Sequence, residues 1–227
     1  MIKFENTDVY GFEAAIRGMR NPMNSWDKSD SVHYSGITDP CDGCPLQIGD
    51  CSTEVYIYNG LCLKVGDADI ALMRKLAHAG DDHGKFARFI NVTVDIVAPL
   101  YWWLEFDTYK IGTVANSCSK MHKIHDKEFS VDDFSHEHLD KYPIELLSET
   151  IRVLNVARRE FLETKDKKYW WYLIQLLPLS YNQKHTMQFD YHMLSRIYRE
   201  RKNNKLDEWN EFCAWIEKLP YFRDIYC

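Results

Sequence analysis

The residues best suited to hold a ligand form one short run of small and hydroxyl-bearing side chains. Such side chains leave backbone N–H groups accessible, and N–H and hydroxyl groups together bind anions such as phosphates. Positive charge follows directly in the sequence. The run contains Asn116, Ser117 and Ser119, and the cations after it are Lys120, His122 and Lys123. We expect a pocket wall here, and the alternative is a buried loop with ordinary packing.

Two expected elements precede this run and would position it. The alternation of β-branched residues over 89–97 predicts a strand. Pro99 ends that strand and suits the first turn of a helix, which would carry the aromatic residues within 101–106. A helix with this aromatic load either forms core or offers rings on which a planar ligand can stack.

The order of strand, aromatic helix and polar motif resembles that of the flavin-dependent thymidylate synthases, the ThyX-like proteins. Their signature is Arg-His-Arg, seven residues and then Ser, with an Asn three residues before that Ser. Here Asn116 and Ser119 stand at the last two positions, whereas Tyr109-Lys110-Ile111 replaces the triplet. The motif is therefore degenerate, and the chain resembles a divergent member of the family.

Positions further along the chain keep the spacing of the same family. The family has Leu-Pro, an Asn twelve residues after the Pro, and an Arg eleven residues further on. Here Leu177-Pro178, Asp190 and Arg201 stand at these distances. His83 takes the place of a histidine that contacts the flavin in the family.

The resemblance implies a role for each matched residue. The catalytic residues that it implies are Ser119 and Lys110. The nucleotide-binding residues that it implies are Arg201, Ser119, Asn116, Ser117 and Lys120. The cofactor-binding residues that it implies are His83, Tyr109, Lys110, Asn116 and Asp190.

The resemblance also implies a reaction, which is transfer of a one-carbon unit from methylenetetrahydrofolate to carbon five of a deoxypyrimidine monophosphate, dUMP. FAD would be the cofactor, NADPH and the folate would be co-substrates, and the assembly would be a homotetramer with sites between subunits. The alternative is a flavin-free nucleotide-binding protein of the same fold, with a regulatory or sequestering role. Loss of the arginines in the triplet favours this alternative, whereas the aromatic helix favours the enzyme.

The predicted fold class is α+β, a ThyX-like fold with a central antiparallel sheet and a cluster of long helices. We expect one thymidylate synthase-like domain over residues 1–227, with an irregular cysteine-bearing insert and a hairpin at about residues 39–66. Asn59-Gly60 between two alternating segments predicts the hairpin. Helices are expected at 9–20, 70–79, 143–164, 166–176, 186–201 and 206–219, with a loop at 182–186. The helix at 166–176 would bury Trp170 and Trp171.

Composition and charge exclude several classes of protein. The chain has 227 residues, 45% of them hydrophobic, with a mean hydropathy of −0.44 and a formal net charge of −6. It lacks the ~20-residue apolar run of a membrane helix and the apolar core of a signal peptide. We therefore expect a cytoplasmic protein, bacterial or from a phage, with no membrane partner. The negative charge argues against a nucleic-acid polymer as partner.

The seven cysteines do not form a convincing disulfide or metal pattern. Their odd count without a secretory signal argues against a disulfide framework. Cys41 and Cys44 have the spacing of half a zinc site, but Cys51 has no partner at short spacing. We expect no metal, with Cys41, Cys44 and Cys51 as weak candidates only.

Overall fold

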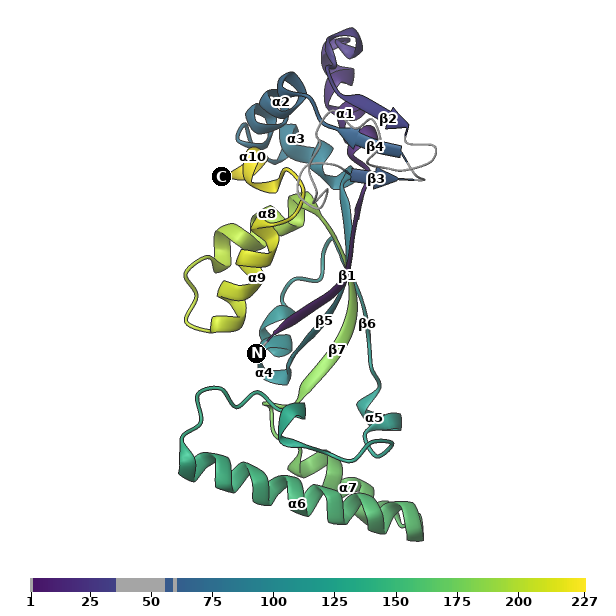
Figure 1. Cartoon of the computed structure of the whole chain (residues 1–227), viewed down its shortest axis with the longest axis vertical. Coiled ribbons are helices and arrows are strands. Elements are labelled where there is room, and N and C mark those ends of the chain that lie inside the picture. The colour runs from purple at the N-terminus through teal and green to yellow at the C-terminus, as the bar shows by residue number, and fades with distance from the viewer. Residues whose placement is uncertain (1, 36–55, 59–60) are drawn as a thin grey trace. The chain divides into compact units, whose positions relative to one another are not determined.

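The chain folds as a mixture of helices and antiparallel strands in a computed structural model, which describes residues 2–35, 56–58 and 61–227 (Figure 1). The strands are β1 (Lys3–Tyr10), β2 (Val32–Ser35), β3 (Tyr56–Tyr58), β4 (Leu61–Lys64), β5 (Asn91–Pro99), β6 (Thr113–Ser117) and β7 (Asn182–Asp190). The α-helices are α1 (Phe12–Arg20), α2 (Asp67–Ala77), α3 (Asp81–Gly84), α4 (Leu100–Phe106), α5 (Lys120–Lys123), α6 (Lys141–Thr164), α7 (Lys167–Leu176), α8 (Tyr191–Arg201), α9 (Asp207–Glu217) and α10 (Phe222–Tyr226). Short 3₁₀ helices are η1 (Asn21–Met23), η2 (Trp26–Lys28), η3 (Lys85–Phe89) and η4 (Val131–Asp133). The predicted α+β class is confirmed.

The strands form two sheets. The larger has the order β1-β5-β7-β6, so the sequence-distant strands β5 and β7 lie side by side at its centre. The smaller has the order β2-β4-β3 with antiparallel pairing throughout. Tyr56–Tyr58 pairs with Leu61–Lys64 at the place where the sequence predicts a hairpin.

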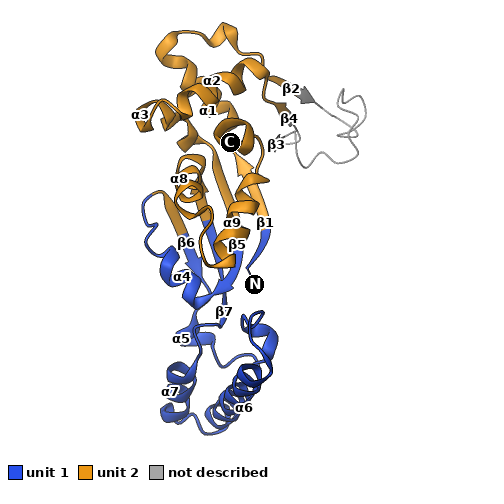
Figure 2. Cartoon of the chain, turned by 90° about the vertical axis from the view of Figure 1, so that its left-hand side faces the viewer, with its two compact units in different colours: residues 1–5, 95–111, 115–187 blue, residues 6–94, 112–114, 188–227 orange. Residues whose placement is uncertain are grey.

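The chain divides into two compact units (Figure 2). Unit 1 comprises residues 1–5, 95–111 and 115–187, and unit 2 comprises residues 6–94, 112–114 and 188–227. Each unit is assembled from segments that are far apart in the sequence. Many contacts within a unit therefore join residues that are far apart in the sequence, and local sequence patterns do not predict such contacts.

The aromatic residues of α4 form core in unit 1 and do not line an open pocket. Trp102 is fully buried, and Trp103 and Phe106 are nearly so. The Trp103 indole donates to the carbonyl of Gln183 in β7 at 3.0 Å, which ties the helix to the strand. Of the two alternatives that the sequence left open for this helix, the structure shows packing in the core for Trp102, Trp103 and Phe106.

A second apolar cluster in unit 1 lies between α6 and α7. Leu147, Ile151 and Leu154 of α6 pack with Leu173 of α7, as the stripe in the sequence predicts. The expected burial of Trp171 is wrong, since 44% of its surface is exposed. Trp171 lies two positions before Leu173 on a helix, and positions so spaced face different directions.

Two expected secondary-structure assignments are also wrong. The first is the start of the helix expected at 9–20, because Val9 and Tyr10 lie in β1 and α1 begins only at Phe12. Gly11 separates the two elements with φ of 100°, and a Cβ there would lie 1.9 Å from the Phe89 carbonyl oxygen. The second is the loop and helix start around Thr186, which lies inside β7.

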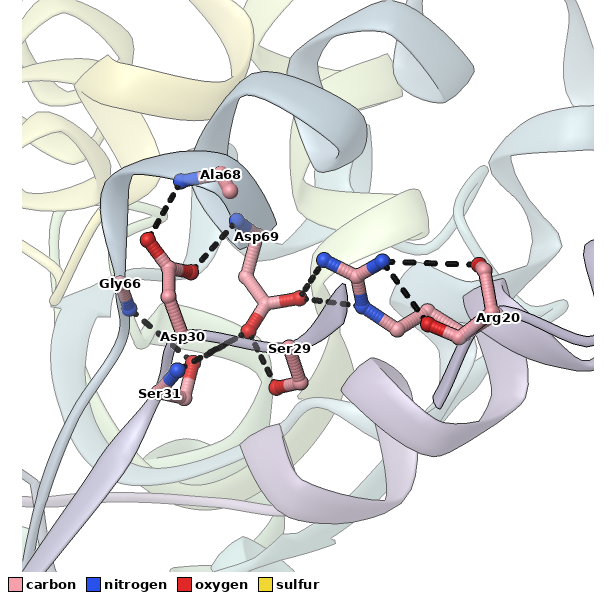
Figure 3. Close-up of polar contacts among 8 residues, drawn as sticks. Arg20, Ser29, Asp30, Ser31, Gly66, Ala68 and Asp69 are labelled. Atoms are coloured by element: carbon pink, nitrogen blue, oxygen red, sulfur yellow. Dashed lines mark hydrogen bonds and ion pairs between the residues drawn. The ribbon is translucent and has the colours of Figure 1, made fainter. Parts of the chain in front are cut away.

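A buried ion pair joins α1 to α2 in unit 2 (Figure 3). Nη2 and Nε of Arg20 lie 2.6 and 2.7 Å from Oδ1 of Asp69, and both side chains are almost fully buried. Oδ2 of Asp69 accepts from the hydroxyls of Ser29 and Ser31, each at 2.6 Å. Burial by itself raises the pKa of Asp69, but these hydrogen bonds and Arg20 outweigh it and hold the pKa below its ordinary value.

The N-terminus of α2 is capped by a residue from outside the helix, Asp30. Its carboxylate accepts from the backbone N–H groups of Ala68 and Asp69 at 2.9 and 3.1 Å. Gly66 makes room for it, because a Cβ there would lie 2.2 Å from the Asp30 carboxyl carbon. Gly66 N also donates to Ser31 Oγ at 3.0 Å. The chain before β2 and the chain after β4 are therefore held together at one point.

Candidate functional site

The residues singled out in the sequence are divided between the two units. Those in unit 1 are Tyr109, Lys110, Asn116, Ser117, Ser119 and Lys120. Those in unit 2 are His83, Asp190 and Arg201. The candidate nucleotide site is described in unit 1, which holds six of the nine residues. They lie on two short segments, residues 109–110 and residues 116–120.

The end of β6 is fixed against β7 by main-chain and side-chain hydrogen bonds. Cys118 N donates to the carbonyl of Lys184 at 3.0 Å, and the Gln183 amide donates to the carbonyl of Cys118. Ser119 then caps the single turn of α5, where its Oγ accepts from His122 N at 3.2 Å. A serine hydroxyl also carries one O–H, which remains to donate to a ligand.

Asn116 and Ser117 lie exposed on β6, which is at the edge of the described sheet. Successive side chains of a strand point to opposite faces. The two residues therefore cannot both contact one ligand held on one face of the sheet. The predicted pair is separated, and Ser117 and Asn116 would serve different surfaces.

Lys120 lies close enough to Asp107 and His185 to interact with both electrostatically. The His185 ring stacks on Trp103, with centroids 3.6 Å apart and planes inclined by 12°. Burial, and after it the charge of Lys120, lowers the pKa of His185 to about 4, although Asp107 acts in the opposite direction. His185 is therefore neutral at pH 7.

Lys120 is the cation of this cluster, although its position is not fully solvated. Burial lowers its pKa, and Asp107 offsets part of that effect. A partly desolvated ammonium binds an incoming anion more strongly than a fully hydrated one, because less water must be removed. Asp107 and His185 were missed by sequence reasoning. A signal for His185 is the alternation Gln183, His185, Met187 and Phe189 in β7, whereas no sequence pattern indicated Asp107.

The degenerate triplet places one side chain inward and two outward. Tyr109 is buried and contacts the Phe106 ring, with centroids 5.9 Å apart. Lys110 is exposed, and Ile111 is 85% exposed. Of these three residues, only Lys110 presents a charged group to which a phosphate could bind.

Two of the three site residues of unit 2, Arg201 and Asp190, have structural contacts of their own. The Arg201 guanidinium lies over the ring of fully buried Trp209, 4.5 Å from its centroid. Oδ1 of Asp190 accepts from Met193 N at 2.7 Å and so caps α8. His83 is exposed on the short helix α3.

The described residues contain no group of three or more His, Cys, Asp or Glu side chains that could hold a metal ion. Cys41, Cys44 and Cys51 lie outside the described residues. Within the described part of the chain, no helix has the length and apolar character needed to cross a membrane.

The fold of the chain is that of the flavin-dependent thymidylate synthases, and the predicted ThyX-like fold is confirmed. The chain is similar to the flavin-dependent thymidylate synthase ThyX from Helicobacter pylori complexed with FAD and dUMP. The TM-score is 0.63 at 15% identity, covering 97% of this chain and 98% of that one. A second structure of the H. pylori protein with FAD and dUMP has the same TM-score at 14% identity, covering 100% of this chain and 97% of that one. The sequence matches no protein-family model and no curated protein.

Proposed function

We propose that this protein is a thymidylate synthase-like enzyme that transfers a one-carbon unit from methylenetetrahydrofolate to carbon five of dUMP. The observation that carries the proposal is the likeness, over almost the whole of both chains, to a flavin-dependent thymidylate synthase complexed with FAD and dUMP. The site residues of this chain must then supply binding and orientation, since the bound cofactor supplies the difficult chemistry. We further propose Ser119 and Lys110 as the residues nearest the reacting groups.

The nucleotide phosphate would bind at the start of α5. Lys120 offers a partly desolvated cation there, and the Ser119 hydroxyl retains a proton to donate. Asn116 and Ser117 point to opposite faces of β6, so we expect only one of the two to contact this ligand in the same subunit. Arg201 is the further nucleotide-binding residue that the spacing suggests. Its guanidinium lies over the ring of Trp209, and we expect it to bind the nucleotide as well.

A flavin would be held by a smaller set of residues than the family uses. Lys110 and Asn116 are exposed and suit a pyrophosphate or ring edge, whereas Tyr109 faces the core. His83 is exposed, and one oxygen of Asp190 is already engaged in capping α8. When bound, FAD would carry hydride supplied by NADPH and relay the one-carbon unit.

Calorimetry with dUMP tests the nucleotide site directly. Lys120→Ala should weaken binding by about 1.5–3 kcal/mol, because a charged hydrogen bond to the phosphate is lost. Lys168→Ala is the matched control, since this exposed lysine of α7 lies over Tyr169 and outside the site. Equal affinities for the wild type and Lys120→Ala would remove the proposed phosphate site.

The second candidate function is a flavin-free nucleotide-binding protein with a regulatory or sequestering role. The inward position of Tyr109 favours it, because that residue of the triplet cannot reach a cofactor. The visible absorption spectrum before and after addition of FAD distinguishes the two. We expect bound-flavin absorption and then turnover of dUMP with methylenetetrahydrofolate and NADPH. A protein that stays colourless but binds dUMP would support the second function.

We also propose that the enzyme is a homotetramer. Asn116, Ser117 and Ser119 are exposed, so these candidate site residues have protein on one side only. A neighbouring subunit would supply the missing wall. Light scattering should give a mass four times that of the 26.9 kDa chain.

A further inference from the structure

Two exposed lysines lie on aromatic rings at the junction of α6 and α7 in unit 1. Nζ of Lys165, the residue that ends α6, lies 5.9 Å from the centroid of the Phe161 ring. Nζ of Lys167, the first residue of α7, lies 6.0 and 5.9 Å from the ring centroids of Trp170 and Trp171. Neither lysine forms an ion pair with another residue in the described part of the chain. Both ammonium groups are therefore available to bind an anion beside exposed rings.

This junction adjoins α5, where the nucleotide phosphate is proposed to bind. The Trp170 indole donates to the carbonyl of Met121 at 3.1 Å, so α7 lies directly beside α5 (Figure 1). The Phe161 ring contacts the ring of His125, with centroids 4.8 Å apart, and His125 follows α5 in the sequence. The two lysines are thus held against the residues that contact α5 and the segment after it.

The acidic side chains nearby do not neutralise the two lysines. Asp126 and Asp166 each pair with another lysine, at 2.9 and 3.4 Å. Glu160 and Glu163 lie one and two positions from Phe161 on α6, and helix positions so spaced do not face each other. The junction therefore keeps a local excess of positive charge, although the whole chain carries a net charge of −6.

We propose that Lys165 and Lys167 bind the tail of the folate co-substrate when that tail is a chain of several γ-linked glutamates. The inference rests on the proposed function and names a binding surface next to its nucleotide site. Each added glutamate brings one carboxylate, which an ammonium group binds, and two methylene groups, which can pack on the Trp171 ring. Trp171 is 44% exposed and accessible to such a chain. Two unpaired lysines match a short anion, whereas the net charge of the chain would repel a nucleic-acid polymer.

Equilibrium binding of two folates that differ only in the tail tests the proposal. The monoglutamate and pentaglutamate forms of 5-formyltetrahydrofolate, a stable reduced folate, are titrated by calorimetry into the protein saturated with FAD and dUMP. The pentaglutamate should bind about tenfold more tightly, because it reaches both lysines and each exposed ion pair contributes only modestly. Raising the salt concentration to about 0.5 M should reduce this difference, since salt screens exposed charges.

A double variant and a matched control locate the effect. Lys165→Gln combined with Lys167→Gln should remove most of the preference for the pentaglutamate and leave the affinity for the monoglutamate unchanged, which also shows that the variant is folded. Lys141→Gln should keep the full preference. Lys141 is an exposed lysine at the start of α6, roughly 35 Å along the helix axis from its other end.

The possible results separate this inference from the proposed function. Equal affinities of the two folates, or a preference that persists in the double variant, would overturn this inference alone. A single-stranded oligodeoxynucleotide that displaces the pentaglutamate at equal concentration would also overturn it, because the surface would then accept any polyanion. Failure of both folates to bind to a protein that binds dUMP would overturn the proposed reaction and this inference together.

Discussion

His185 illustrates how the surroundings of one side chain change its chemistry. Its ring lies flat on Trp103 and shares the neighbourhood of Lys120 and Asp107. No hydrogen-bond partner is found for its buried Nε2 among the described residues. Protonation there would place a cation in a partly dry position beside another cation, so the neutral form is strongly favoured.

Acid should therefore destabilise the fold through His185. The unfolded chain takes up a proton near the ordinary pKa of 6.5, whereas the native chain does so only at about 4. Stability consequently falls as the pH decreases from about 6.5 to about 4. The full difference corresponds to about 3 kcal/mol, and solvent screening of this partly exposed ring reduces it to about 1–2 kcal/mol.

Urea unfolding at pH 7.0 and 4.5 measures this effect, with His185→Gln as the comparison. The wild type should lose about 1–2 kcal/mol more than the variant between the two pH values. Other acid-sensitive groups contribute to both proteins and cancel. Equal losses would show that His185 titrates normally.

Arg201 should have two separable contributions. Its guanidinium lies 4.5 Å from the Trp209 ring centroid, a contact worth about 0.5–2 kcal/mol. Arg201→Ala should lower the free energy of unfolding by about 1 kcal/mol and weaken dUMP binding by about 1.5–3 kcal/mol. Urea unfolding and calorimetry on the same sample give both values. Lost stability with unchanged affinity would mean that Arg201 is structural only.

At the scale of the elements, side chains from outside a helix decide where it begins. Asp30 caps α2 from a segment 38 residues away in sequence, as its contact with Ala68 shows. Asp190 caps α8 at the end of β7, four residues later than the helix start predicted at Thr186. Both carboxylates accept from backbone N–H groups and favour the positive end of the helix.

Removal of the Asp69 charge should be costly. In Asp69→Asn, Arg20 remains buried without a counter-charge, and such a loss costs about 3–5 kcal/mol. Asp67→Asn is the matched control, because Asp67 is exposed in the same first turn of α2. Chemical unfolding of the two variants measures the difference. A loss no larger than that of the control would show that the ion pair adds no net stability.

At the scale of the whole molecule, the two units have cores of different origin. The α6–α7 cluster of unit 1 is built from residues within 124–173, apart from partly buried neighbours, whereas the packing of unit 2 includes residues as distant as Phe12 and Tyr191. Local contacts and long-range contacts therefore contribute unequally to the two units.

A cavity in the α6–α7 cluster should increase local opening of α6 and α7 more than opening of the rest of the chain. Leu154 is fully buried, and Leu154→Ala should cost about 2–5 kcal/mol. Hydrogen exchange followed by mass spectrometry should show faster exchange in α6 and α7, with α9 affected less. Uniform acceleration in all three helices would indicate that the chain opens only as a whole.

Local patterns were sufficient where one face of an element alone is buried. The stripe Leu147, Ile151 and Leu154 and the inward residues Trp209 and Phe212 were readable at helical spacing. The strand β7 was mistaken for a loop followed by the start of a helix. Its buried residues Gln183 and Met187 alternate with polar residues over a short segment directly before α8, so the local pattern did not separate strand from helix. The signal for a strand became decisive only through its pairing with β5.

The sequence by itself determined the α+β class and the order of most elements, because apolar periodicity survives substitution of individual residues. The ThyX-like fold followed from the resemblance to the family in motif order and spacing. It also identified Asn116, Ser119 and Lys120 as neighbours along the chain. Only the tertiary structure decided that the α4 rings form core, that Asn116 and Ser117 lie in a strand, whose alternation separates them, and that His185 and Asp107 join Lys120. These properties depend on which distant segment packs against each residue, and burial and electrostatic interactions between distant segments exist only after folding.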